Sequence, residues 1–105
     1  MLRKARADDV QAIHTLINYF ASKNLMLPRS LSELYDAVRD FFVWEEDGQV
    51  VACAAGHVVW KDLAEIRSLA VREDKQGKGI GTQLVRGCVE ELARLGVRRV
   101  FTLTY

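Results

Sequence analysis

The sequence predicts a mixed α+β fold, in which a central antiparallel meander is followed by a helical crossover into a last strand. Three features of the 105-residue chain support this prediction. An Asp-Gly pair at 47–48 separates two strand-like runs, which is a strong hairpin signal. A glycine-rich segment at 76–81 separates another such run from a long amphipathic helix. A last strand-like run begins at Val97, after that helix.

The first third of the chain predicts one short strand and two helices. Residues 2–6 are expected to form the strand, and Asp8 is expected to cap the helix after it. Helical spacing predicts the core face of this helix: Val10, Ile13, Leu16, Ile17 and Phe20. After a loop at 23–29, Ser30-Leu31-Ser32-Glu33 has the pattern of a capping box, so we expect a second, short helix to begin there.

The rest of the chain predicts three strands, a helix and a final strand. The three strands occupy 41–46, 49–60 and 64–71. The helix after the glycine segment is expected to end at Gly96, and its core face is Ile80, Leu84, Cys88, Leu92 and Leu95. The final strand spans 97–105. Because a helix separates the last two strands, we expect them to pair in parallel.

Composition and charge narrow the classes of function. The chain has 15 basic and 14 acidic residues without a basic stripe, which argues against a nucleic-acid partner. It has neither an apolar run that could span a membrane nor the apolar stretch of a signal peptide near its N-terminus. Cys53 and Cys88 lie far apart, without metal-ligand spacing. We therefore expect buried free thiols, no metal site and a cytoplasmic protein.

The segment Gln76-Gly77-Lys78-Gly79-Ile80-Gly81 predicts a phosphate-binding loop. A loop with few side chains can bring its backbone N–H groups close to a ligand, and the helix that begins there adds unpaired N–H groups and a positive dipole end. The segment lacks the Gly-Lys-Ser/Thr end of a P-loop. Its evenly spaced glycines, late in the chain, do not match a dinucleotide-binding loop either.

A Gln-x-x-Gly-x-Gly pattern preceded by Leu69-Ala70-Val71 resembles the acyl-CoA loop of the GNAT N-acetyltransferase superfamily, whose element order is also the one predicted here. The resemblance implies the GNAT acyl-CoA N-acyltransferase fold and acetyl-CoA as cofactor. It implies that one set of positions holds the pyrophosphate: Gln76, Gly77, Lys78, Gly79, Ile80, Gly81 and Thr82. Leu69 and Val71 would pair with the pantetheine arm, and the N–H of Leu69 or Ala70 would face the thioester oxygen. Lys75 and Lys78 are further candidates for phosphate contact, with a solvated basic turn as an equal alternative for Lys75.

Acetyl transfer to an amine also needs a base, because an ammonium group has no lone pair. The candidate is Glu65, four residues before Leu69 on the same strand. Without a bulge, strand alternation places Glu65, Arg67, Leu69 and Val71 on one face. The alternative role of Glu65 is an ion pair with Arg67 or another cation.

Three segments are similar to the acetyltransferase domain of N-acetylglutamate synthases: Leu27-Pro28-Arg29-Ser30, residues 64–71 and residues 100–104. This resemblance implies an amino-acid N-acetyltransferase of arginine biosynthesis. It implies that Glu65 activates the amine through water and that Arg29 binds a carboxylate of L-glutamate. Two alternatives stay open: an acetyltransferase for another small-molecule or protein amine, and a non-catalytic acyl-CoA-binding module.

Members of this family continue beyond the last strand seen here, with a further helix and two strands. The chain stops at Tyr105, so we expect residues 1–105 to be a single GNAT domain that is incomplete at its C-terminus. An exposed hydrophobic last strand offers an edge for pairing. We therefore expect a homodimer through this strand.

Overall fold

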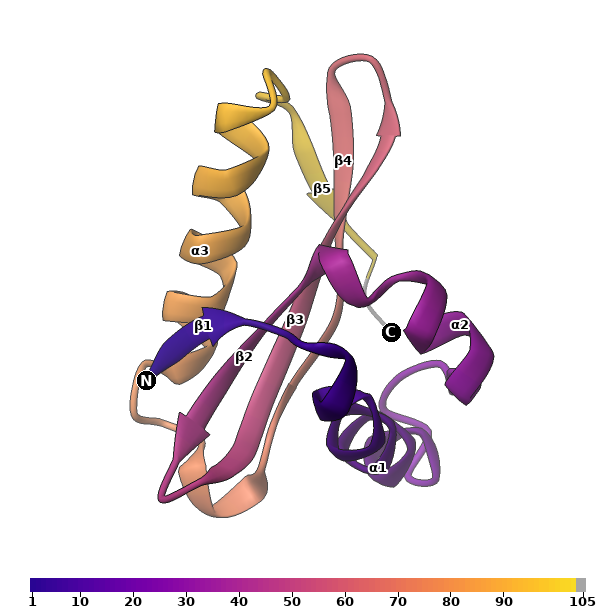
Figure 1. Ribbon diagram of the computed structural model, residues 1–105, viewed down its shortest axis with the longest axis vertical. Helices are drawn as coiled ribbons and strands as arrows, with labels where there is room; N and C mark the ends of the chain where they lie inside the picture. Colours follow the sequence, from indigo (N-terminus) through magenta and orange to yellow (C-terminus); the bar gives the residue numbers. More distant parts are fainter. Residues whose placement is uncertain (104–105) are drawn as a thin grey trace.

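A five-stranded mixed sheet forms the centre of the computed structural model, which describes residues 1–103 (Figure 1). Its strands lie in chain order: β1 (Leu2–Lys4), β2 (Phe41–Glu46), β3 (Gln49–Trp60), β4 (Leu63–Val71) and β5 (Val100–Thr102). Neighbours from β1 to β4 pair antiparallel, whereas β4 and β5 pair in parallel. The predicted meander, crossover and parallel last pair are therefore confirmed.

Helices cover both faces of the sheet. The described helices are α1 (Val10–Ala21), α2 (Leu31–Asp36) and α3 (Ile80–Arg94), with short 3-10 turns η1 (Ala7–Asp9), η2 (Val38–Asp40) and η3 (Glu73–Lys75). In Figure 1, α3 lies on one side of the sheet and α1 with α2 on the other. None of the described helices is long and apolar enough to cross a membrane.

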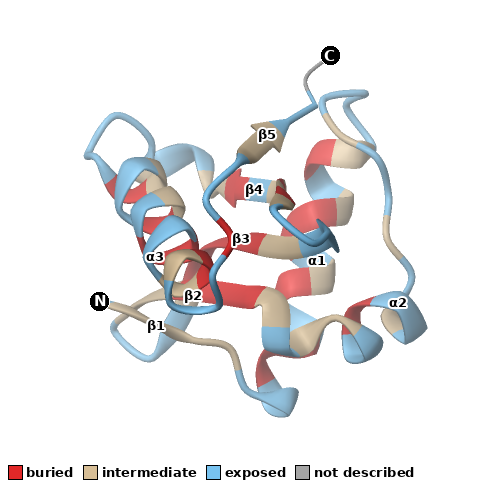
Figure 2. Cartoon of the chain, turned by 90° about the horizontal axis from the view of Figure 1, so that it is seen from above, coloured by how far each residue is buried: buried red, intermediate tan, exposed pale blue. Residues whose placement is uncertain are grey.

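Two apolar clusters form the core, one on each face of the sheet. Strand alternation sends Phe41 toward α1 and its neighbour Phe42 toward α3. The predicted apolar residues of α1 are all buried. In Figure 2 the buried residues are on the central strands and on turns of α1 and α3. Both cysteines are buried and free as predicted, and burial raises the pKa of the Cys53 thiol to about 12 and that of Cys88 to about 11.

Most differences from the predicted elements lie at their ends. The first strand is 2–4 rather than 2–6, and the last is 100–102 rather than 97–105, of which residues 104–105 lie outside the described part. Leu95 was expected in the core but is 66% exposed. The reason is that α3 ends at Arg94, which leaves Leu95 as the C-cap before Gly96 at φ +87°.

Local sequence signals set two further boundaries as predicted. Asp47 and Gly48 both have positive φ, at +52° and +75°, as a tight turn between β2 and β3 requires. At the start of α2, the backbone N–H of Glu33 donates to Ser30 Oγ at 3.1 Å, and the N–H of Ser30 donates to Glu33 Oε1 at 2.9 Å. The capping box is therefore complete.

The start of α1 differs from the prediction: Asp9, not Asp8, is the N-cap residue, and its side chain makes no capping hydrogen bond to α1. Its buried carboxylate accepts hydrogen bonds from Arg3 Nη1 at 2.8 Å, Arg3 Nη2 at 2.9 Å and the Arg6 backbone N–H at 2.7 Å. Asp8 is exposed and lies 3.4 Å from Arg6. An extra turn, η1, precedes α1, and the Asp9 carboxylate closes the capping box of this turn instead of capping α1.

Replacing Asp9 with asparagine is expected to destabilise the fold by about 3 kcal/mol at pH 7, since a buried ion pair loses one partner. The hydrogen bonds from Arg3 lower the pKa of Asp9. Asp9 therefore stabilises the fold above its unfolded pKa of about 4, and this contribution is lost as the pH falls through the folded pKa. Urea unfolding at pH 7 and in acid measures both effects. Asp8→Asn is the control, and an equal loss in both variants would contradict this role.

Candidate active site

The loop between β4 and α3 has the backbone of a phosphate-binding loop. Gly77 and Gly79 have φ of +78° and +84°, a region that costs other residues about 1–2 kcal/mol. The Gln76 side chain donates from Nε2 to the Val71 carbonyl at 2.9 Å, which ties the loop to the end of β4. Ile80 is buried and begins α3 beside the loop. The N–H groups in the first turn of a helix have no intrahelical acceptor, so those of α3 are available next to the loop.

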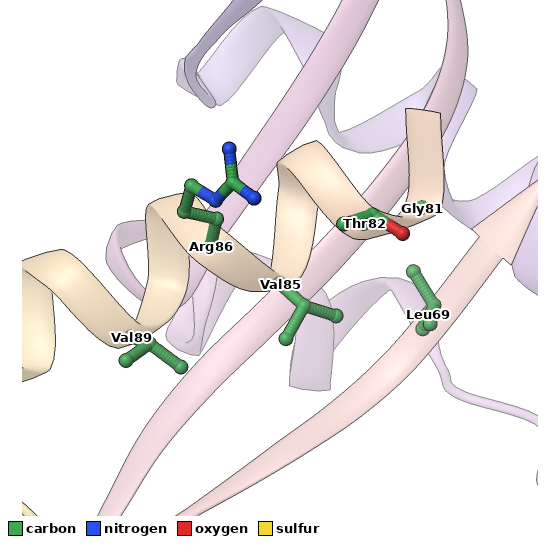
Figure 3. A pocket seen from close by; sticks show the side chains of 6 residues that line it. All are labelled: Leu69, Gly81, Thr82, Val85, Arg86 and Val89. Carbon is green, nitrogen blue, oxygen red and sulfur yellow. The ribbon is translucent and has the colours of Figure 1, made fainter. Parts of the chain in front are cut away.

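A groove of about 600 Å³ runs beside this loop, between β4 and α3 (Figure 3). Its lining residues are Leu69, Gly81, Thr82, Val85, Arg86 and Val89. The walls are largely apolar, with one hydroxyl and one guanidinium from α3. Sequence reasoning missed Arg86, although it follows Thr82 by one helical turn and so shares its face.

The two lysines near the loop differ in their surroundings. Lys75 Nζ lies 2.8 Å from Glu46 Oε1 on β2, and this carboxylate raises the pKa of Lys75. Lys75 therefore makes an ion pair within the fold instead of extending as a phosphate contact. Lys78 is exposed within the glycine loop.

Strand β4 contains a β-bulge in front of the loop. Cys53 on β3 pairs with Ala70, whereas Ala55 pairs with Arg67, so two residues of β4 oppose one residue of β3. Ser68, the first of the two, has φ +57°. A bulge disrupts the hydrogen-bond ladder locally and bends the strand. The backbone of Ser68–Ala70 is thus the irregular part of β4 next to the groove.

The predicted alternation along β4 is wrong beyond Ser68, because the bulge was not expected. Ile66 packs in the cluster under α3, so Glu65 and Arg67 lie on the face of α1 and α2. Beyond the bulge the faces are exchanged: Leu69 lines the groove beside α3, and Val71 packs in the same cluster. Glu65 and Leu69 therefore do not share a face. The extra residue reverses the alternation, as the register of a strand dictates.

Glu65 makes the ion pair that was the alternative to its role as a base. Its Oε1 accepts a hydrogen bond from Arg67 Nη2 at 2.8 Å, and the Glu65 side chain is 15% exposed. The Nε atom of Arg67 is buried without a hydrogen-bond partner among the described residues. Within residues 1–103, the second oxygen of Glu65 makes no contact with a guanidinium group.

Arg29 lies against the bulge. Its Nη1 donates to Ser68 Oγ at 3.1 Å, and its Nε lies 3.7 Å from Glu33 on α2. Asn18 of α1 donates to the Arg29 carbonyl at 3.0 Å, which holds this part of the loop against the helix. The Arg29 side chain is 15% exposed. The fold thus brings together a guanidinium from residue 29 and the strand that carries Glu65, on one face of the sheet.

Comparison with known proteins identifies the family. Residues 7–105 match the model of the acetyltransferase (GNAT) family. The chain belongs to this family. The GNAT assignment covers the glycine loop, the bulge and all three helices described above, and it agrees with the fold and the acyl-CoA loop predicted from the sequence.

Individual GNAT relatives are similar over the whole chain. An amino-acid acetyltransferase of Mycobacterium tuberculosis is 42% identical over 100% of this chain and 62% of its own length. A crystal structure of an M. tuberculosis protein in complex with CoA has a TM-score of 0.93 at 42% identity, covering 100% of this chain and 64% of that one. N-acetylglutamate synthase from Neisseria gonorrhoeae, complexed with coenzyme A and N-acetyl-glutamate, has a TM-score of 0.94 at 30% identity, over 99% of this chain and 25% of that one. This chain therefore spans less than two thirds of the length of these relatives.

Proposed function

We propose that this chain is the acetyl-CoA-binding and catalytic part of an amino-acid N-acetyltransferase whose acceptor is L-glutamate. The observation that carries the proposal is the placement of Arg29 against the bulge of β4, on the same face of the sheet as Glu65. A carboxylate held by Arg29 would bring the attached amino group to the strand where a base and the thioester meet. The names of the similar M. tuberculosis and N. gonorrhoeae proteins support the same acceptor class.

The groove beside α3 suits the acyl-CoA. The N–H groups of Gln76 to Thr82 would hold the pyrophosphate, with Lys78 and Arg86 as nearby cations. The apolar wall would cover the pantetheine arm, whose amides pair with the backbone of Leu69 and Val71 as an added strand would. At the bulge, the N–H of Leu69 or Ala70 would donate to the thioester oxygen as negative charge develops there.

Glu65 would act from the other face of β4. It would accept a proton from the ammonium group through a water molecule, so that the nitrogen lone pair can attack the thioester carbon. Arg67 fixes one oxygen of the carboxylate. A bulge interrupts the hydrogen-bond ladder locally, so an N–H at Leu69 or Ala70 would be available to the thioester, with the base on one face of β4 and the cofactor groove on the other.

Calorimetric titration with acetyl-CoA tests the cofactor site. The same titration of two glycine variants tests whether the glycine loop forms that site. A Cβ at Gly81 would lie 3.7 Å from Val71 Cγ2, an ordinary contact, so Gly81→Ala should keep the fold. We expect it to weaken acetyl-CoA binding by about tenfold, because the added methyl group keeps the backbone from the ligand. Gly79→Ala should weaken binding and also cost about 1–2 kcal/mol of stability, since its φ is +84°.

Gly48→Ala is the control, because Gly48 has a positive φ and does not line the groove. It should lose stability and keep acetyl-CoA affinity. Equal affinities for the wild-type chain and Gly81→Ala would refute this cofactor site. Saturable binding without any turnover on an amino-acid screen would favour the non-catalytic acyl-CoA-binding module.

Two further predictions accompany this function. The free buried thiols suit a reducing compartment, so we place the protein in the cytoplasm. β5 lies at one edge of the sheet and has a neighbour only on its β4 side within the described residues, which supports pairing with a second copy along that edge. Sedimentation of the purified chain over a range of concentrations would test the dimer.

A further inference from the structure

Asp40 and His57 form a hydrogen-bonded pair that joins η2 to β3. His57 Nδ1 lies 2.7 Å from Asp40 Oδ2. Asp40 ends η2, just before β2, and His57 lies on β3. The two side chains are 28% and 42% exposed, so the imidazole is packed at one edge and reaches solvent at the other.

The sheet register places this pair beside Glu65. His57 on β3 pairs directly with Glu65 on β4, and residues directly opposite each other share a face with their Cβ atoms about 4.5–5.5 Å apart. The neighbouring Gly56 faces α3, since a Cβ built there would lie 3.2 Å from Cys88 Cβ. His57 therefore points to the opposite face, between Asp40 on the β2 side and Glu65 on the β4 side.

The hydrogen bond to Asp40 determines which nitrogen of His57 is available. A carboxylate accepts, so Nδ1 carries the proton and the lone pair remains on Nε2, the tautomer that acts as a base. The charged groups placed around the imidazole are Asp40 from η2 and Glu65 with Arg67 from β4.

The chemistry of amine acetylation calls for more than one proton acceptor. An ammonium nitrogen loses one proton before it attacks and a second when the amide forms. The departing thiolate takes up one proton, so one is released to solvent in each turnover. Glu65 can hold one proton, and one of its oxygens is already bound to Arg67. Its side chain is also the less exposed of the two neighbours, at 15% against 42% for His57.

We propose that His57, oriented by Asp40, is a second proton acceptor beside Glu65; this inference rests on the proposed function. Glu65 takes the first proton from the ammonium through water, and the nitrogen lone pair forms the C–N bond. The proton remaining in excess on the adduct nitrogen passes through water to Nε2 of His57. The C–S bond breaks with its electron pair on sulfur, the thiolate takes the proton from Glu65, and His57 releases its proton to solvent.

The first test is independent of turnover. Nitrogen-15 NMR of the labelled chain reports which ring nitrogen carries the proton, and we expect the Nδ1–H tautomer for His57. In Asp40→Asn the amide group can donate toward Nδ1, so the tautomer should change. A wild-type His57 protonated on Nε2 at neutral pH would overturn the proposal.

The second test is steady-state kinetics with acetyl-CoA and L-glutamate. His57→Gln should lower kcat by about 100-fold and leave both KM values within about twofold. Imidazole added to the buffer should restore part of the lost kcat in a saturable manner, which a purely structural defect would not show. His14→Gln, which changes the other histidine of the chain, should behave as wild type.

Two results would overturn the proposal while leaving the proposed function intact: wild-type kcat in His57→Gln, or a reduced kcat that imidazole does not restore. A different result would refute both the proposed function and the role of His57. If the wild-type chain binds acetyl-CoA but transfers no acetyl group to L-glutamate or any other amino acid, the proposed function fails, and the proton path fails with it.

Discussion

Glu65→Gln is expected to lower kcat for acetyl transfer by about 10²–10⁴-fold, because general acid–base catalysis contributes on that order. Glutamine keeps the size of the side chain and can still accept a hydrogen bond from Arg67, so the geometry of β4 should persist. The KM for acetyl-CoA should stay near its wild-type value, since the groove lies on the other face of the strand. Initial rates at saturating acetyl-CoA and L-glutamate measure the effect.

Glu90→Gln is the matched control for this variant. Glu90 is exposed on α3, so its substitution removes one negative charge outside the site, as Glu65→Gln does within it. If Glu65→Gln turns over at the wild-type rate, Glu65 is not the base, and its role is the ion pair with Arg67. In that case His57 would be the remaining candidate base on this face of the sheet.

Arg29→Ala is expected to raise the KM for L-glutamate by about 10–100-fold. A hydrogen bond between charged groups contributes about 1.5–3 kcal/mol, and a factor of ten corresponds to about 1.4 kcal/mol. The KM for acetyl-CoA should change little, because Arg29 lies on the α1 and α2 side of β4. Arg29→Lys should recover part of the affinity, since lysine keeps the charge but not the planar fork. Substrate titrations for both variants provide the measurement.

Arg94→Ala, in the exposed last turn of α3, controls for the loss of a positive charge. It should leave both KM values unchanged. A glutamate KM that stays at the wild-type value in Arg29→Ala would show that the acceptor carboxylate is bound elsewhere. The hydrogen bond from Arg29 to Ser68 would then serve only to brace the bulge.

Much of the fold followed from short-range patterns in the sequence. The Asp47-Gly48 turn and the Ser30–Glu33 capping box depend on neighbouring residues alone, and both were predicted correctly. The same holds for the apolar spacing of α1. Leu95 and Asp8 were misplaced because a helix end and an added 3-10 turn each depend on a balance of cap hydrogen bonds that spacing does not reveal.

The candidate site depended more on long-range contacts. Strand alternation predicted that Glu65 and Leu69 share a face. The sequence of the strand did not predict the bulge, because serine seldom adopts the positive φ that Ser68 has. The pairing of Lys75 with Glu46 joins segments that only the fold brings together. The same is true of Asp40 and His57, which are 17 residues apart and meet because η2 leads into β2 beside β3.

Hydrophobic period and glycine content act over a few residues, so they were enough to predict the order of the elements and the glycine loop. The base and the carboxylate-binding guanidinium stay predictions from the family resemblance. The tertiary structure decided which side chains share a face and which are already paired. The physical reason is that one extra residue in β4 exchanges the faces of every residue beyond it, and register is fixed by packing between strands. Only in the folded sheet do Arg29, Glu65 and His57 lie on one side and the groove between β4 and α3 on the other.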